Sequence, residues 1–316
     1  MQNDFKPNIL LIWLLIISLI SGCLSGCSNQ KADDISSGES SDIESSPYPK
    51  GHNEDENSNL GAWGRAMGSV LISINDGNPY YFGGYEATEA NEKAASGILK
   101  SSWNILGRED LLKQIQQLLQ TGSRADYRRE AQEMNALSKK EREKAWKQLP
   151  DELEIYYSDL EYNWDTWGKR GLLAWDFCRI SHLAQWGYIA GYLNLEEAQA
   201  VIEPAAIRLQ KQFDSWEEVI KNWLDGYCLS ASVPIESVEK TDYDNRMEVY
   251  ETLVSEQEQR GILYDDSLFD TEIIPIEGIS YQSIMDELNT EKGQNKETLK
   301  NSKKEKTKRK GGEDTK

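Results

Sequence analysis

The side chains with the most distinctive chemistry lie in one apolar stretch of the chain, residues 171–192. Asp176 and Arg179 are three positions apart there, so on a helix they lie on one flank and can form an ion pair. With Trp175 and His182 they are a candidate pocket, in which the guanidinium group would bind a carboxylate or a phosphate. Buried ion pairs also serve to fix how helices dock, and we expect that structural role for this pair.

Two further groups in the same stretch have spacings that suggest reactions. Cys178 and His182 are four positions apart, a spacing that suits a thiolate with its base or two metal ligands. We expect Cys178 to be a small core residue instead, because the only other histidine is His52 and a His-rich metal site is thereby excluded. Cys178 and Cys228 are also a possible disulfide in an oxidising compartment.

Motifs that would identify an enzyme class are missing from the sequence. It has no Gly-rich phosphate loop, no nucleophile elbow around a serine and no metalloprotease helix. We therefore predict no cofactor and no metal, and the sequence leaves open whether the protein is an enzyme.

The N-terminus has the pattern of an export signal. Residues 9–20 are a nearly unbroken apolar run of the length found in signal peptides, and the run ends at Ser21-Gly22-Cys23. This end resembles a bacterial lipobox, which implies cleavage after residue 22 and two acyl chains, such as palmitate, on Cys23. A second match ends at Cys27, and an uncleaved anchor helix is the alternative. We expect an exported lipoprotein, held on the cell membrane or envelope with its domain outside the cytoplasm.

Charge and composition divide the rest of the chain. A net charge of -19 argues against a nucleic-acid partner. Nine of the ten tryptophans lie within residues 61–232, so we expect one folded domain there. Residues 23–60 are rich in Ser, Asp, Glu and Asn and predict a disordered acidic tether, and residues 286–316 predict a disordered basic tail. Residues 233–285 hold 13 acidic and 3 basic side chains, and we expect an acidic extension packed on or beside the domain, or an arm that recognises a partner.

Helix signals fill the domain. Ser138, Asn194 and Ser215 each stand three residues before a glutamate, the arrangement of a capping box. We expect helices over residues 62–74, 86–103, 109–120, 125–136, 139–148, 171–192, 195–213 and 216–229. Strand signals are few, so the predicted class is all-α, a compact multi-helix bundle around a central buried helix at 171–192. That helix is not a membrane span, because charged side chains in lipid are costly.

The tryptophans at positions 103, 146, 164, 167, 175, 186, 216 and 223 have two possible roles. They can line a ligand groove, but core packing explains them more simply. We expect Trp164 and Trp167 to lie in a loop-like stretch, where they can be exposed.

Four ordered stretches of the domain resemble a bacterial family catalogued as domain of unknown function 1266. They are Ser102-Trp103-Asn104-Ile105-Leu106-Gly107-Arg108-Glu109-Asp110-Leu111, Ala174-Trp175-Asp176-Phe177-Cys178-Arg179, Trp186-Gly187-Tyr188-Ile189-Ala190-Gly191-Tyr192, and Phe213-Asp214-Ser215-Trp216-Glu217-Glu218 with Asp225-Gly226-Tyr227. The resemblance covers roughly residues 63–230 and implies an all-helical domain, but no activity. Pro204 departs from the family pattern, which implies an unbroken helix there, and it predicts a kink or a new helix start.

These observations favour a membrane-tethered, non-enzymatic interaction or envelope protein with an unidentified protein partner. The alternative is an enzyme or small-ligand binder with its site around Asp176, Arg179 and His182. A deep polar cavity at these three residues would favour the alternative, and a dry, tightly packed pair would favour the first hypothesis.

Overall fold

The structure is a computed structural model, and it describes residues 58–235, 237 and 239–290. The predicted signal peptide, Cys23, Cys27, nearly all of the tether and most of the basic tail lie outside the described residues.

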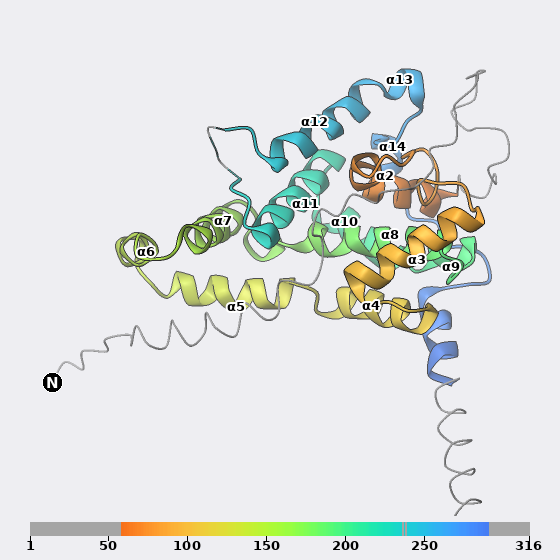
Figure 1. Cartoon of the computed structure of the whole chain (residues 1–316), viewed down its shortest axis with the longest axis horizontal. Coiled ribbons are helices and arrows are strands. Elements are labelled where there is room, and N and C mark those ends of the chain that lie inside the picture. Colours follow the sequence, from red (N-terminus) through yellow and green to blue (C-terminus); the bar gives the residue numbers. More distant parts are fainter. Residues whose placement is uncertain (1–57, 236, 238, 291–316) are drawn as a thin grey trace, which may run out of the picture.

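Helices make up all the regular secondary structure of the described residues, which confirms the all-α prediction (Figure 1). In chain order they are α2 (Asn59–Ile74), α3 (Glu89–Trp103), α4 (Arg108–Gln120), α5 (Arg124–Asn135), α6 (Lys139–Trp146), α7 (Asp151–Trp167), α8 (Leu173–Ile189), α9 (Leu195–Ala200), α10 (Glu203–Gln212), α11 (Trp216–Ala231), α12 (Asp242–Ser255), α13 (Gln257–Arg260) and α14 (Asp266–Asp270). Residues 281–290 are also helical. None of the described helices combines the length and the apolarity that crossing a bilayer requires.

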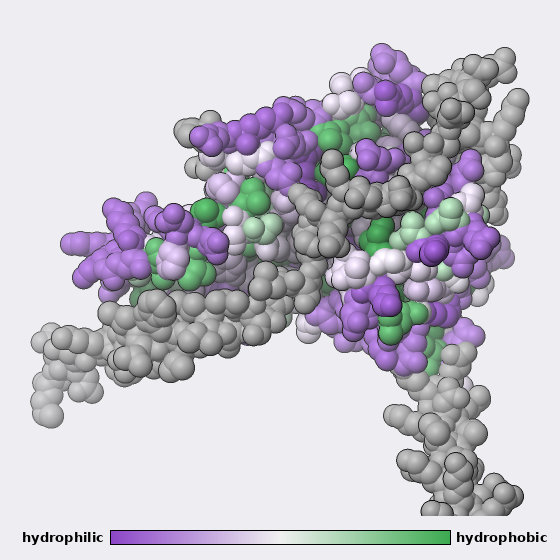
Figure 2. Space-filling view, viewed as in Figure 1, coloured by the Kyte–Doolittle hydropathy of each residue, from purple (hydrophilic) through white to green (hydrophobic). Residues whose placement is uncertain are grey.

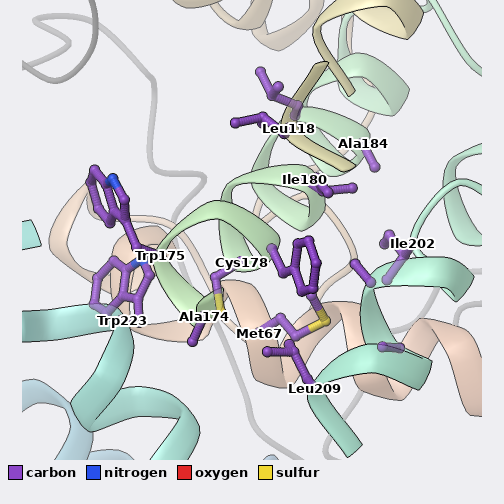
Figure 3. Close-up of a cluster of buried hydrophobic side chains, with 14 of the residues drawn as sticks. Met67, Leu118, Ala174, Trp175, Cys178, Ile180, Ala184, Ile202, Leu209 and Trp223 are labelled. Atoms are coloured by element: carbon purple, nitrogen blue, oxygen red, sulfur yellow. The ribbon is translucent and has the colours of Figure 1, made fainter. Parts of the chain in front are cut away.

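Helix α8 lies at the centre of the bundle, as its apolar sequence predicts. Every residue of α8 except Tyr188 is buried, and α2, α3, α4, α9, α10 and α11 all pack against it. Figure 3 shows its core-facing side chains, among them Ile180 and Ala184. Gly187 allows α4 to approach closely, because a Cβ atom there would lie 2.3 Å from Leu111. The helix therefore positions any site built on it within the core.

The helix starts follow the caps in the sequence. Ser138 and Asn194 both form capping boxes, as predicted. Ser215 accepts a hydrogen bond from the backbone N–H of Glu218, but the Glu218 carboxylate accepts from Asp214 instead of from Ser215. Local hydrogen bonding thus explains why these helices begin where they do.

The helix expected over residues 195–213 is two helices. α9 ends at Ala200 and α10 begins at Glu203, with Pro204 in its first turn. Proline has no N–H to donate and is favoured at a helix start, so it begins α10 rather than continuing α9.

The expectation of a loop around Trp164 and Trp167 is wrong. Both residues lie in α7, where Trp167 is buried and Trp164 is partly buried against the core. Pro150 precedes this helix, and its first turn holds Asp151 and two glutamates. Proline followed by acidic residues is a helix-start signal, since negative charge is stabilising at a helix N-terminus.

The C-terminal part of the described chain contributes to the core. α12 packs against α2 and α11, and the rings of Phe269 and Trp63 are 5.4 Å apart between centroids. Trp216 lies 5.1 Å from the same Phe269 ring and 6.1 Å from Tyr264. The outer side of α12 and α13 in Figure 2 is mostly hydrophilic, so this acidic segment has one apolar face and one charged face.

The folded unit extends beyond the boundaries expected at residues 61 and 286. Ser58 caps α2, and Leu60, in the expected tether, is fully buried. Leu288, in the expected tail, is 5% exposed. Both stretches are polar in composition, but each places an isolated leucine against the core.

Candidate functional site

Asp176, in the first turn of α8, is the best-bonded carboxylate among the described residues. Its side chain is fully buried and accepts four hydrogen bonds. Two come from the backbone N–H groups of Ser123 at 2.9 Å and Arg124 at 3.1 Å. The other two come from guanidinium groups, Arg124 Nη1 and Arg179 Nη2, each at 2.6 Å. Both carboxylate oxygens are therefore occupied by charged and neutral donors.

The Asp176 carboxylate belongs to α8 and also caps α5, which precedes α8 in the chain. The Ser123 side chain makes no capping bond to α5, and its Oγ accepts from Arg179 at 2.9 Å. Asp176 instead bonds the first free N–H groups of α5, a place where negative charge is favourable. Gly122 makes this approach possible: its φ is +55°, and a Cβ atom there would lie 2.1 Å from Asp176 Oδ2.

Arg124 connects this carboxylate to α4. It donates to the carbonyl oxygens of Leu118 at 2.9 Å and Leu119 at 3.2 Å, near the C-terminal end of α4. Its guanidinium carbon lies 4.6 Å from the centre of the Phe177 ring. Asp176 and Arg124 together thus hold the end of α4, the start of α5 and the start of α8 at one junction.

We interpret the contacts at this junction as structural. The Asp176 oxygens already have their partners, and Arg179 is 9% exposed and lies over the Trp175 ring at 4.5 Å. The sequence predicts the Asp176–Arg179 contact but not Arg124. No local signal identifies Arg124, because it lies 52 residues from Asp176.

Cys178 and Cys228 are both free and buried in the structure, so the possible disulfide between them is not formed. Their surroundings differ. Asp159 and Asp225 act electrostatically on Cys228, whereas Cys178 lies among core side chains such as Met67 (Figure 3). Burial raises the pKa of both thiols far above the ordinary range, which makes a reactive thiolate unfavourable.

His182 is held neutral. Burial, with Arg179 and Arg246 nearby, lowers the pKa of its imidazole to about 3. Its ring lies 6.1 Å from the Trp186 ring and 6.1 Å from the Trp223 ring. Neither of its ring nitrogens has a hydrogen-bond partner, so His182 is not paired with Cys178 as a base.

One of the indoles beside this imidazole, that of Trp223, lies next to a further indole, that of Trp175. Trp175 and Trp223 lie side by side, with ring centroids 6.4 Å apart (Figure 3). Both are 3% exposed, and the Nε1–H group of each has no partner. Together with His182 they form a buried set of unpartnered nitrogens, and Trp175 and His182 are two of the predicted pocket residues.

A second feature, which the sequence did not reveal, is an acidic cavity of about 270 Å³ beside α7. Its lining residues come from one face of α7 and from the segment that follows α11: Glu154, Ile155, Ser158, Asp159, Tyr162, Pro234 and Ile235. In Figure 1 that segment leads from α11 to α12. The backbone N–H of Ile235 donates to Asp159 Oδ1 at 3.3 Å and so fixes the segment to α7.

One of the cavity's lining residues, Asp159, has a buried carboxyl group, and a second buried carboxyl group, that of Asp225, acts on it electrostatically. Asp159 is 5% exposed and Asp225, on α11, is 2% exposed. Burial raises the pKa of Asp159 to about 7, opposed by the Ile235 hydrogen bond and assisted by repulsion from Asp225. Burial also raises the pKa of Asp225 to about 6, although the Trp167 indole donates to it at 2.6 Å. Perturbed carboxyl groups in a concave site are a mark of a functional location.

The described residues include no cluster of three or more His, Cys, Asp or Glu side chains suited to holding a metal ion. Of Asp159 and Asp225, only Asp225 belongs to a stretch with a sequence signal, Asp225-Gly226-Tyr227. Asp159 has no such signal, because its partners come from α11 and from the segment after it.

Comparison with known proteins gives a family and one distant relative. The family model described as Protein of unknown function (DUF1266) matches residues 98–261, which include Asp159, Asp176 and Asp225. The Uncharacterized protein YbeR of Escherichia coli (strain K12) is 23% identical over 128 residues, 40% of this chain and 54% of that protein. The chain thus spans about half the length of this curated relative. No solved structure matches the chain.

Proposed function

The chain belongs to the family described as Protein of unknown function (DUF1266), and we propose that this member is a lipid-anchored protein of the cell envelope that binds a protein partner and does not catalyse a reaction. The proposal joins two parts of the chain. The N-terminal segment supplies the anchor, and the helical domain supplies the binding surface.

The bonding of Asp176 carries the case for binding over catalysis. A general base or a nucleophile needs a free lone pair, but both oxygens of this carboxylate are used by donors from Ser123, Arg124 and Arg179. The hydrogen bonds of Asp176 connect α4, α5 and α8. The carboxylate that most resembles a catalytic residue in the sequence therefore stabilises the packing of these helices. Burial raises the pKa of Cys178 and disfavours its reactive thiolate, and it lowers the pKa of His182 to about 3, which makes the imidazole a weak base.

The support for the anchor lies in the sequence. An apolar run over residues 9–20 that ends at Ser21-Gly22-Cys23 is suited to lipid transfer onto a cysteine. Two acyl chains give stable membrane attachment where one chain does not.

Metabolic labelling with a palmitate analogue tests the anchor. We expect the wild type to be labelled and to fractionate with membranes, and Cys23→Ala to lose both properties. Cys27→Ala is the matched control and should behave as the wild type does. Equal labelling of all three proteins would refute a lipid on Cys23, and loss of label in Cys27→Ala alone would assign it to the second site.

A pull-down from detergent-solubilised membranes tests the binding role. We expect the anchored wild type to retain a protein partner in a fixed ratio through salt washes. A wild-type preparation that retains no protein would overturn the binding role without affecting the anchor.

One observation favours the alternative, a small-ligand binder around Asp176, Arg179 and His182. The unpartnered nitrogens of His182, Trp175 and Trp223 are buried, and buried polar groups are normally paired. Native mass spectrometry of the purified chain decides between the two. A bound small molecule that is present in the wild type and absent in His182→Leu would move this alternative to first place.

A further inference from the structure

The acidic cavity beside α7 holds uncompensated negative charge. Asp159 lines it and is buried, yet among the described residues the backbone N–H of Ile235 is the only hydrogen-bond donor to its carboxylate. Its Oδ2 has no hydrogen-bond partner in the described part of the chain, and the carboxylate of Asp225 acts on it electrostatically. Burying a charge without a counterion is strongly unfavourable.

The protein neutralises the buried carboxylate of Asp176 in a different way. Asp176 accepts hydrogen bonds from two guanidinium groups and two backbone N–H groups. Asp159 has neither a guanidinium nor an ammonium group bonded to it among the described residues. The contrast within one structure indicates that the partner of Asp159 comes from outside the described chain.

Three buried carboxyl and amide oxygens of α7 and α11 have no hydrogen-bond partner among the described residues. They are Asp159 Oδ2, Asp225 Oδ1 and Asn163 Oδ1, and all three residues are at least nine-tenths buried. Asn163 joins the two acids, because its Nδ2 donates to the carbonyl oxygen of Asp159 at 3.0 Å and to that of Asp225 at 3.5 Å. Of these three residues, Asp159 lines the cavity, and the partner that its Oδ2 lacks is a hydrogen-bond donor.

We propose that the cavity bounded by Glu154, Asp159 and Ile235 binds an organic cation with a primary ammonium group on an alkyl stem. An ammonium group brings N–H donors and a positive charge, and the unpartnered Asp159 Oδ2 at the cavity lacks both. Ile155, Pro234 and Ile235 supply apolar walls for the stem. The volume of about 270 Å³ has room for a chain of several carbon atoms.

The residues favour an ammonium over an inorganic cation. Calcium takes six to eight oxygen ligands and magnesium needs nearly octahedral geometry, whereas the described residues bring no group of three His, Cys, Asp or Glu side chains together for a metal. Glu154 and Ser158 are exposed at the cavity while Asp159 is buried, so a ligand enters at the α7 surface with its charged end toward Asp159.

Ligand binding is coupled to pH through the charged and titratable groups around Asp159. Glu154 and Tyr162 line the same cavity, Asp225 acts on Asp159, and Asp159 acts on Cys228. One step further out, Lys221 acts on Asp225, Asp242 and Arg246 act on Cys228, and Tyr243 is affected by Asp225 and Cys228. Because the pKa of Asp159 is about 7, its carboxyl group is largely protonated in mild acid and must lose that proton to hold an ammonium. The ammonium keeps its own proton well above neutral pH, so affinity increases as the pH rises from about 5 to about 8.

The inference deepens the proposed binding role and rests on it, because the same cavity accepts either a small amine or a lysine side chain of a partner. These two sources share one chemistry. Free n-pentylamine represents the first source, and Nα-acetyl-lysine amide represents the second. A failure of both leaves the lipid anchor and the pull-down result unaffected.

The experiment uses the full chain in detergent at constant ionic strength, at about pH 8. Titration calorimetry measures n-pentylamine, Nα-acetyl-lysine amide, 1-pentanol and calcium chloride. We expect saturable binding of at least one ammonium compound and none of 1-pentanol, which has a similar stem without the charge. A preference for Nα-acetyl-lysine amide assigns a lysine side chain as the source, and a preference for n-pentylamine assigns a free amine.

Two substitutions on α7 give the matched comparison. Asp159→Asn removes the buried charge and keeps the shape, and Asp165→Asn makes the same change at an exposed position outside the cavity. We expect Asp159→Asn to weaken binding about thirtyfold or more, and Asp165→Asn to bind as the wild type does.

Asp159→Asn is expected to fold, because it removes a charge that burial disfavours, and its thermal melt checks this. Three results would overturn the proposal. They are no binding of either ammonium compound to the wild type, equal binding to Asp159→Asn, and calcium binding that depends on Asp159 while the ammonium compounds fail.

Discussion

Removal of the Asp176 carboxylate should destabilise the domain more than any other single change at the junction of α4, α5 and α8. Asp176→Leu leaves the guanidinium groups of Arg124 and Arg179 without their counterion, and it leaves two N–H groups at the start of α5 unpaired. The carboxylate is fully buried and Arg124 is 4% exposed, so water cannot replace the lost partner.

The magnitude follows from the contacts. Breaking a buried ion pair from one side costs about 3–5 kcal/mol, and losing a helix cap adds about 1 kcal/mol. Arg179→Met should cost only about 1–2 kcal/mol, because Arg124 continues to neutralise Asp176. Arg124→Met should lie between the two, since it also leaves the carbonyl groups of Leu118 and Leu119 without their donor.

Urea unfolding followed by circular dichroism measures these differences. With a slope of about 2–3 kcal/mol per molar urea, the Asp176→Leu midpoint should fall by about 2 M. The double-mutant cycle of Asp176→Leu with Arg124→Met should give a larger coupling energy than the cycle with Arg179→Met.

The refuting results are specific. Midpoints equal to the wild type in Asp176→Leu, Arg124→Met and Arg179→Met would show that the junction does not stabilise the fold. Such results would return the ligand-binding hypothesis to first place. A larger loss in Arg179→Met than in Arg124→Met would show that Arg124 is not the principal partner of Asp176.

Two further predictions concern stability. The native pKa of Asp159 is about 7, above the ordinary value of about 3.9. Between these two pH values the folded state holds a proton that the unfolded state has lost. The free energy of unfolding therefore falls as the pH rises from about 4 to about 7. Asp159→Asn should therefore exceed the wild type in stability by about 2–4 kcal/mol at about pH 8 and by little at about pH 4. Urea titrations at both pH values check this, and a constant difference would contradict it. A chain that ends at residue 232 lacks Tyr264 and Phe269, which cover Trp63 and Trp216. It should melt at a lower temperature and with less cooperativity than a chain that ends at residue 290, and coincident melts would contradict this.

Much of the helical architecture could be predicted from short-range signals. The capping boxes at Ser138 and Asn194 occur where the sequence places them, and the apolar stretch around Asp176 is the central buried helix. Capping and apolar periodicity act over three or four residues, so one segment contains the whole signal. Pro150 and the acidic residues after it are a signal of the same kind for the start of α7, although we expected a loop around Trp164 and Trp167.

The sequence by itself thus determined the helical class, most helix starts, the burial of α8 and the short-range pair of Asp176 with Arg179. Only the tertiary structure decided that Arg124 is the second partner of Asp176, that Asp225 acts electrostatically on Asp159, and that Phe269 covers Trp63. These partners are 52, 66 and 206 positions apart in the chain. Contacts over such separations depend on how whole helices pack, because packing brings together side chains that no local pattern relates.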